Sequence, residues 1–188
     1  MPSALVVYES MFGNARRVAE TVAETLGREG FDVDVRRVAD APSQPRVDLL
    51  VLGGPTHALG MSRAATRATR EAHVSSEEDR ARVASEPGAD TGPGVREYLR
   101  RVDLSPGQPV AVFDTRASTT VRAGASKGIA RRATALGGRL VTSAQSFLVT
   151  GMTGPLAPGV EDAARQWGRE IARGVQPRVS ELPGASRT

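Results

Sequence analysis

Hydrophobic and polar positions follow two distinct patterns along this chain. Short continuous apolar runs at residues 4–8, 48–52 and 110–113 are typical of strands buried on both faces. Residues 31–35 instead alternate between apolar and polar side chains, which predicts a strand with one solvated face at a sheet edge. A last strand is expected within residues 139–149. The chain therefore carries the pattern of a five-stranded sheet.

Apolar positions between these runs recur with the period of an α-helix. Val18, Val22 and Leu26 lie four residues apart, and they predict a helix that begins near Ala15 and ends at the glycines of residues 27–30. Three further stripes predict helices through Val95, Leu99 and Val102; through Ala125, Ile129, Ala133 and Leu136; and through Val160, Ala164, Trp167 and Ile171. Strands and helices in this order are typical of the α/β class, with a parallel sheet covered by helices on both faces.

The length of 188 residues favours one domain, and we expect it to span residues 1–174. Residues 62–93 are too long for a simple connection, so they are interpreted as an insertion in the crossover, helical over residues 64–73 and partly mobile. Residues 175–188, with two prolines and a glycine, are expected to form a disordered tail.

Composition excludes several classes of function. The chain has no cysteine, so it has no disulfide and no thiolate site, and His57 and His73 are too isolated to predict a metal site. No run approaches the ~20 apolar residues of a membrane span, and no signal peptide is recognised, so we expect a cytoplasmic protein without a membrane partner. The net charge is +4, but basic and acidic residues are interspersed, and no nucleic-acid partner is expected.

The candidate chemistry lies in the loops that follow three of the strands, where open parallel sheets bind their ligands. The first loop leads directly into a helix, whose free N–H groups favour a phosphate. Ser10 offers a hydroxyl, Gly13 permits close approach of the backbone, and Arg16 offers a charge. This loop predicts a phosphate site formed by Ser10, Met11, Phe12, Gly13, Asn14 and Ala15.

The second and third loops suit a flat polar ring. The second combines two glycines, a rigid proline and both polar and apolar side chains, and its candidate residues are Pro55, Thr56, His57, Ala58, Leu59 and Gly60. The third follows the strand at residues 110–113, and its candidate residues are Thr115, Arg116 and Ala117. Neither a P-loop nor a G-x-G-x-x-G motif is present, so ATPase and dinucleotide-binding functions lose their main support.

Together the three loops resemble those of the flavodoxin-like family. Residues 10–15 are similar to the flavodoxin phosphate loop, and residues 53–57 are similar to its second flavin loop. Residues 113–116 with residues 125–128 resemble the FDTR…SKG pattern of a bacterial flavodoxin-domain subfamily. The resemblance covers residues 4–171, nearly the whole expected domain.

This resemblance implies a flavodoxin-like three-layer sandwich, with a five-stranded parallel sheet in the order 2-1-3-4-5 and helices on both faces. It implies bound FMN, a cofactor that carries the redox chemistry, so no catalytic residue is expected. The first loop would hold the phosphate, while the second and third would flank the ring, with Arg116 stabilising an anionic reduced flavin. The expected function is electron transfer with a redox protein partner. The alternating strand at residues 31–35 supports the same strand order independently.

Two alternatives remain open. Residues 53–61 also resemble a loop of FMN-dependent NAD(P)H:quinone or flavin reductases, which would make NAD(P)H the partner. The other alternative is a flavin-free module that binds a partner on the same fold. It follows from Ala15, where flavodoxins commonly have a hydroxyl residue, from the Glu9 carboxylate beside the phosphate loop, and from the absence of Trp and Tyr in the other two loops.

Overall fold

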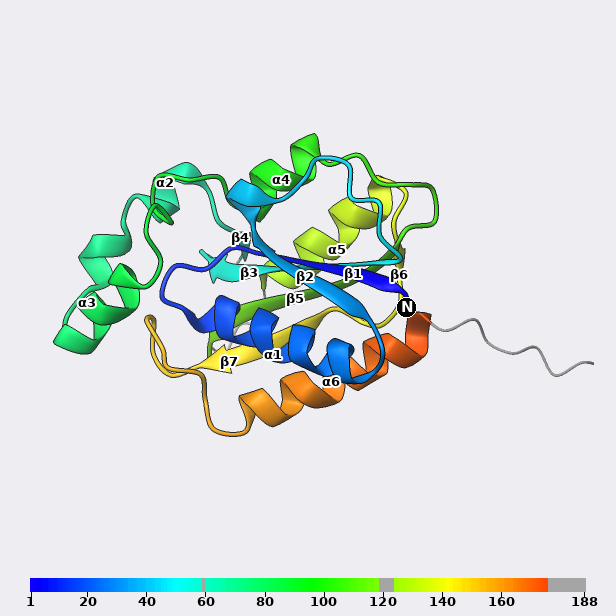
Figure 1. Ribbon diagram of the computed structural model, residues 1–188. Helices are drawn as coiled ribbons and strands as arrows, with labels where there is room; N and C mark the ends of the chain where they lie inside the picture. The colour runs from blue at the N-terminus through cyan, green and yellow to red at the C-terminus, as the bar shows by residue number, and fades with distance from the viewer. Residues whose placement is uncertain (59, 119–123, 176–188) are drawn as a thin grey trace, which may run out of the picture.

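A parallel sheet forms the centre of the computed structural model, which describes residues 1–58, 60–118 and 124–175 (Figure 1). Its strands are β1 (Ser3–Tyr8), β2 (Asp32–Arg37), β3 (Leu49–His57), β5 (Pro109–Ala117), β6 (Arg139–Leu140) and β7 (Gln145–Val149). They lie in the order β2-β1-β3-β5, and both β6 and β7 pair with β5. A short strand, β4 (Gly60–Met61), turns back antiparallel to β3.

The strand order confirms the flavodoxin-like arrangement expected from the sequence. β6 pairs with the start of β5 and β7 with its end, so the two short strands together fill the fifth position. The alternating strand, β2, lies at the sheet edge, as predicted, and pairs with β1. β3 runs five residues and β5 four residues past the apolar segments that predicted them, because residues 53–55 continue the backbone ladder with residues 113–115 after the apolar pattern has ended.

Helices cover both faces of the sheet (Figure 1). α1 (Asn14–Arg28) and α6 (Val160–Val175) lie on one face, and α4 (Val95–Arg101) and α5 (Ala125–Ala135) lie on the other. Alternate residues of β1 enter two separate cores, with Val6 packed among the residues of α1 and α6 and Val7 among those of α4 and α5. Gly27 lies inside α1, and Gly30, with φ +92°, takes the left-handed conformation after the helix end.

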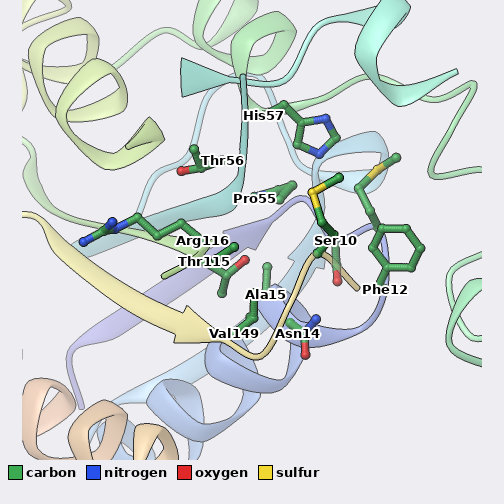
Figure 2. A pocket seen from close by; sticks show the side chains of 13 residues that line it. Ser10, Phe12, Asn14, Ala15, Pro55, Thr56, His57, Thr115, Arg116 and Val149 are labelled. Atoms are coloured by element: carbon green, nitrogen blue, oxygen red, sulfur yellow. The ribbon is translucent and has the colours of Figure 1, made fainter. Parts of the chain in front are cut away.

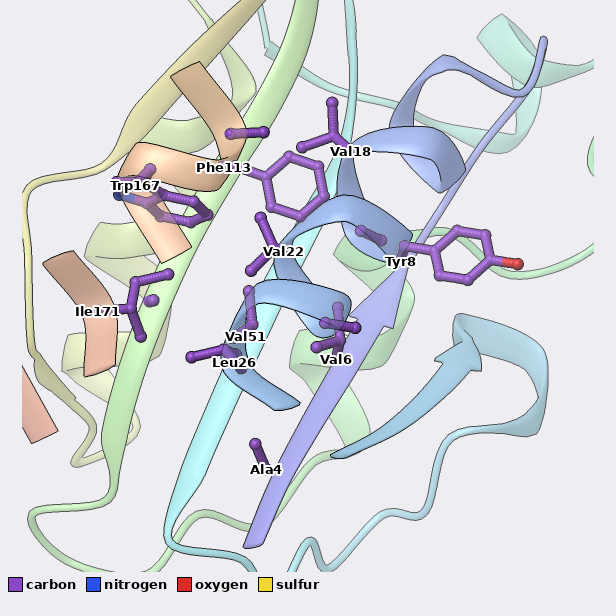
Figure 3. Close-up of a cluster of buried hydrophobic side chains, with 14 of the residues drawn as sticks. Ala4, Val6, Tyr8, Val18, Val22, Leu26, Val51, Phe113, Trp167 and Ile171 are labelled. Carbon is purple, nitrogen blue, oxygen red and sulfur yellow. The ribbon is translucent and has the colours of Figure 1, made fainter. Parts of the chain in front are cut away.

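An aromatic cluster closes the core beneath α1 and α6 (Figure 3). The rings of Phe113, Phe147 and Trp167 meet edge to face, with centroids 5.8–6.0 Å apart. Gly53 of β3 makes room for this cluster, since a Cβ atom there would lie 2.0 Å from the Phe113 ring. Gly53 therefore lets β3 and β5 pair closely just before both strands reach the loops that sequence analysis singled out.

The insertion, residues 62–93, has helical structure beside the carboxyl ends of the strands (Figure 1). It holds α2 (Ala64–Arg67), the 3-10 helix η2 (Arg70–His73) and α3 (Glu77–Ala84), while a second 3-10 helix, η1 (Val38–Asp40), follows β2. The first two were expected from the sequence, whereas α3 was not, because it lacks an apolar stripe. The sequence does carry a local signal for the start of α3, because Ser76 and Asp79 form a capping box. The mobility of the insertion stays a prediction.

The expected domain, residues 1–174, is described almost throughout, whereas residues 176–188 of the expected tail lie outside the described residues. No helix in the described part of the chain is long and apolar enough to cross a membrane.

Replacing Gly53 by alanine is expected to lower the free energy of unfolding by about 1–3 kcal/mol, the usual cost of overpacking a core. Gly27→Ala is the matched control, because nothing lies within 4 Å of its Cβ position, and helix propensity should raise stability by up to about 1 kcal/mol. Urea unfolding followed by Trp167 fluorescence measures both variants. A Gly53→Ala protein as stable as the parent would contradict the close packing described above.

Candidate functional site

A hollow lies where the carboxyl ends of β1, β3, β5 and β7 meet (Figure 2). Its volume is about 90 Å³. Sites for small organic ligands usually measure at least about 300 Å³, so such a ligand would fill this hollow and extend beyond its rim. The lining residues are Ser10, Met11, Phe12, Asn14, Ala15, Pro55, Thr56, His57, Thr115, Arg116, Ala117, Val149 and Met152.

The hollow brings together residues from all three loops that sequence analysis selected. Of the selected residues, Gly13 forms the turn into α1, Ala58 lies in the turn after β3, and Gly60 begins β4; none of the three lines the hollow. Leu59 lies outside the described residues. Val149 and Met152 were not among the expected residues, although both follow the general rule, since they lie at and after the carboxyl end of β7.

The N-terminus of α1 faces this hollow with unpaired donors. Gly13 has φ +82°, and the first helical bond runs from Arg17 N–H to its carbonyl at 2.9 Å. The N–H groups of residues 14–16 therefore have no partner within the helix. No side chain caps this end, and no acidic residue lies in its first turn. The buried Ser10 hydroxyl makes no close hydrogen bond among the described residues, although it lies near enough to the Glu86 carboxylate to lower the pKa of Glu86. These donors fit an anion such as a phosphate.

Two side chains that sequence analysis assigned to the phosphate have other partners. The Asn14 side-chain amide donates to the Thr153 carbonyl at 2.8 Å, so it ties the first loop to the loop after β7. The Arg16 guanidinium lies 3.1 Å from the carboxylate of Glu86 in the insertion. The direct contact between Arg16 and the phosphate stays a prediction, and in this structure the guanidinium is paired with Glu86. The backbone N–H groups and the Ser10 hydroxyl remain the donors available to an anion.

Glu9 points away from the hollow, although it directly precedes the first loop. Its buried carboxylate accepts a hydrogen bond from Val95 N–H at 2.8 Å, at the start of α4. Burial raises the pKa of Glu9, and the Ser62 hydroxyl and the nearby Arg67 partly offset this effect. The carboxylate therefore lies on the α4 side of the sheet and does not oppose an anion at α1.

The insertion is attached to the site through polar groups. Its buried residues are all polar or charged, namely Ser62, Arg67, Arg70, Asp79 and Glu86. The Glu86 carboxylate lies between two guanidinium groups, 3.1 Å from Arg16 and 2.8 Å from Arg37. Burial raises the pKa of Glu86, and the two arginines counter that rise. Glu86 therefore bonds the insertion to α1 and β2 at once.

Asp79 makes the second attachment of the insertion. The Thr153 hydroxyl and the Ser75 N–H donate to its carboxylate, and these bonds lower the pKa of Asp79. Arg82 lies 3.3 Å from the same carboxylate and donates to the Gly154 carbonyl at 3.2 Å. The loop after β7 is thus held by Asn14 on one side and by α3 on the other.

A buried network fixes the far wall of the hollow. The Asp114 carboxylate accepts hydrogen bonds from the Thr56 hydroxyl at 3.1 Å and from Ser126 N–H at 2.8 Å. The Thr56 oxygen in turn accepts from Ala125 N–H at 2.8 Å. Side chains from β3 and β5 therefore cap α5 together, and this cap sets the spacing between the second and third loops.

The walls differ in chemistry (Figure 2). The Phe12 ring and the His57 imidazole lie on the same side of the hollow, and the Arg116 guanidinium extends on the opposite side. Burial lowers the pKa of His57, so its imidazole is neutral at pH 7. The hollow thus offers an aromatic side and a cationic side. Phe12 supplies a phenyl ring from the first loop, whereas the second and third loops contain no Phe, Trp or Tyr.

The buried Glu9 carboxylate should make stability depend on pH. Because burial raises its pKa, the folded chain holds this proton more tightly than the unfolded chain. Its contribution is complete below the ordinary pKa of 4.5 and is lost as the pH rises through the raised value. We therefore expect Glu9→Gln to become progressively more stable than the parent between pH 4 and pH 8, measured by urea unfolding.

Glu29→Gln, at an exposed position, is the control and should show no such trend. A Glu9→Gln variant that is less stable than the parent at pH 8 would show that the carboxylate stabilises the start of α4 by more than its burial costs.

Comparison with known proteins identifies the family. The family model described as Flavodoxin matches residues 6–167. Among solved structures, a flavodoxin from the domain Archaea superposes with a TM-score of 0.61 at 17% identity, over 92% of this chain and 98% of that one. Flavodoxin 2 from Bacillus cereus superposes with a TM-score of 0.61 at 16% identity, over 91% of this chain and 98% of that one. The flavodoxin of Streptococcus pneumoniae TIGR4 superposes with a TM-score of 0.58 at 15% identity, over 91% of this chain and 98% of that one.

The structural matches agree with the three-layer α/β sandwich and its strand order, and at these identities they establish the fold alone. The family follows from the match of the family model over most of the sequence. Members of this family bind FMN, the cofactor that the loop motifs imply. On its sequence and its fold, this chain belongs to the flavodoxin family.

Proposed function

We propose that this chain binds FMN in the hollow at the carboxyl ends of its strands and transfers electrons between redox partners. The observation that carries the proposal is the convergence of a free helix N-terminus with two ring-flanking loops in one hollow. The residues present fit the cofactor at its anionic end, because the start of α1 is uncapped and the buried Ser10 hydroxyl beside it makes no close hydrogen bond. When bound, the flavin supplies the redox chemistry.

In this proposal the phosphate lies against the backbone N–H groups of residues 13–16 and the Ser10 hydroxyl. Hydrogen bonds to a charged group are stronger than those to a neutral one, and the partial positive charge of the α1 N-terminus adds to them. Arg16 acts indirectly, since its pairing with Glu86 leaves no free carboxylate to oppose the phosphate. Ala15 lines the hollow without a hydroxyl, and its backbone N–H is still available.

The ring would lie between the second and third loops, with its edges exposed to polar groups. Pro55, Thr56 and His57 form one side, and Thr115, Arg116 and Ala117 form the other. The Asp114 network holds Thr56 in place and keeps the two loops at a fixed spacing. A neutral His57 adds no charge beside the ring, so Arg116 is the cation that we assign to a reduced, anionic flavin.

The flavin-free alternative loses support from the position of Glu9. The carboxylate that would oppose a phosphate is bonded to α4 instead, and Phe12 supplies an aromatic side chain at the hollow.

Electron transfer and NAD(P)H-dependent reduction of a quinone share the same flavin site. Steady oxidation of NADPH by the FMN-loaded protein with a quinone would favour the reductase, and its absence would favour a shuttle between proteins.

A visible absorbance spectrum followed by titration tests the proposal. We expect FMN to bind more tightly than riboflavin, because only FMN carries the phosphate. Ser10→Ala should weaken FMN binding by about 10- to 100-fold, the effect of losing one hydrogen bond of about 1.5–3 kcal/mol to a charged group. It should leave riboflavin binding unchanged. Quenching of flavin fluorescence measures both affinities.

Ser43→Ala is the matched control, since this exposed serine lies outside the lining of the hollow. Equal affinities for FMN and riboflavin would place the phosphate away from α1. No binding of either flavin at high concentration would overturn the proposed function.

Arg116→Ala should make the reduction potential of the bound flavin more negative, because it removes the cation assigned to the reduced form. A tenfold loss of relative affinity for that form corresponds to about 30 mV for a two-electron couple. Anaerobic titration with a reference dye measures the shift. Arg139→Ala, exposed on β6 at the other end of the sheet, is the control. An unchanged potential in Arg116→Ala would contradict this role.

A further inference from the structure

Positive charge is concentrated on one face of the molecule. α4 carries three arginines and one glutamate, and α5 carries one lysine and two arginines without an acidic residue. The excess on these two short helices is larger than the net charge of the whole chain, +4. On the opposite face, α6 carries three arginines and three acidic residues, and Arg17 of α1 pairs with Glu161 of α6.

A groove runs between α4 and α5, with a volume of about 460 Å³. Arg96 and Arg100 line it from α4, and Arg131 and Arg132 line it from α5; we call it the arginine groove. Its lining also includes the buried side chain of Leu99. Within the described residues, no carboxylate lies within ion-pair distance of Arg100, Arg131 or Arg132, and all three are exposed.

The arginine groove adjoins the flavin hollow through one residue. Met61 lines the groove and pairs directly with Thr56, which lines the hollow. Arg96 donates to the Met61 carbonyl at 3.0 Å, and a Cβ at Gly128 of α5 would lie 3.4 Å from the Met61 side chain. Strand pairing places opposite Cα atoms about 4.5–5.5 Å apart. A molecule seated in the groove therefore lies next to one wall of the hollow.

We propose that the arginine groove is the docking surface for an acidic protein that exchanges electrons with the flavin. The proposal rests on the proposed function, since it names the partner of the same site. The cations follow two helices and do not converge on one point, which suits an extended acidic surface better than a single phosphate. An apolar floor between charged rims is typical of a protein interface. Complementary charge would steer the partner to the side where the hollow lies.

Stopped-flow kinetics with two protein probes test this surface. The FMN-loaded protein is reduced with dithionite, freed of excess reductant and mixed with plastocyanin, an acidic copper protein. Each Cu(II) accepts one electron and becomes Cu(I), so a fully reduced flavin reduces two molecules. Cytochrome c, a basic protein that also accepts one electron, is the comparison. We expect plastocyanin to react faster at low ionic strength and to slow as salt is added.

Arg100→Glu with Arg131→Glu should slow the plastocyanin reaction at least tenfold, since steering changes association rates by about 10- to 1000-fold. Arg169→Glu with Arg173→Glu is the matched control, because it makes the same change in net charge on exposed positions of α6. Equal slowing by both double variants would show a net-charge effect without a docking surface. Unchanged rates in the groove variant would overturn the proposal outright.

Calorimetric titration with plastocyanin, on the protein with and without FMN, separates this proposal from the proposed function. Binding that is lost in the groove variant and retained in the α6 variant supports the surface, even if no flavin binds. Retained FMN binding without plastocyanin binding overturns the surface alone. A 20-nucleotide single strand that binds the groove more tightly than plastocyanin would overturn the acidic protein in favour of a nucleic acid.

Discussion

The parallel pairing of β3 with β5 is the constraint on which the site depends. Gly53 lets the two strands approach over the Phe113 ring, and the ladder then continues for several residues beyond the apolar core. Both ring-flanking loops therefore leave the sheet from adjacent, aligned strand ends. The side chains of Asp114 and Thr56 also hold the two strand ends in place, because they hydrogen-bond to each other and Thr56 accepts from the start of α5. The hollow is a direct product of the register of the sheet.

Buried charges around the hollow are arranged so that the first loop faces no unpaired carboxylate. Glu9 bonds to the start of α4, and Glu86 lies between two arginines. Burying a charged group costs free energy unless the group is paired and hydrogen-bonded. Because both carboxylates are buried, each of them needs these partners. The α1 N-terminus keeps its positive character as a result. The local field at the first loop is thus set by residues that do not line the hollow.

The sequence predicted the elements whose cause is local and apolar. Buried strands and amphipathic helices such as α6 can be recognised from the periodicity of their apolar residues. The rule that parallel sheets bind ligands at the carboxyl ends of their strands located most of the hollow. It could not show that Arg16 pairs with Glu86, because 70 positions separate them and only the tertiary fold brings them together. The arginine groove could be predicted only in part. Arg131 and Arg132 lie in residues 115–160, which contain no acidic residue, but only the packing of α4 beside α5 brings Arg96 and Arg100 to them.

The insertion has a thermodynamic consequence that follows from what it buries. All of its buried residues are polar or charged, so it adds no apolar side chain to either core. A segment attached mainly by ion pairs and hydrogen bonds exposes little new apolar surface when it detaches, and the free energy of that opening is lower than that of global unfolding. We therefore expect the insertion to open as a separate cooperative unit while the sheet stays folded. Its amide hydrogens would exchange with solvent through openings that leave the strands intact.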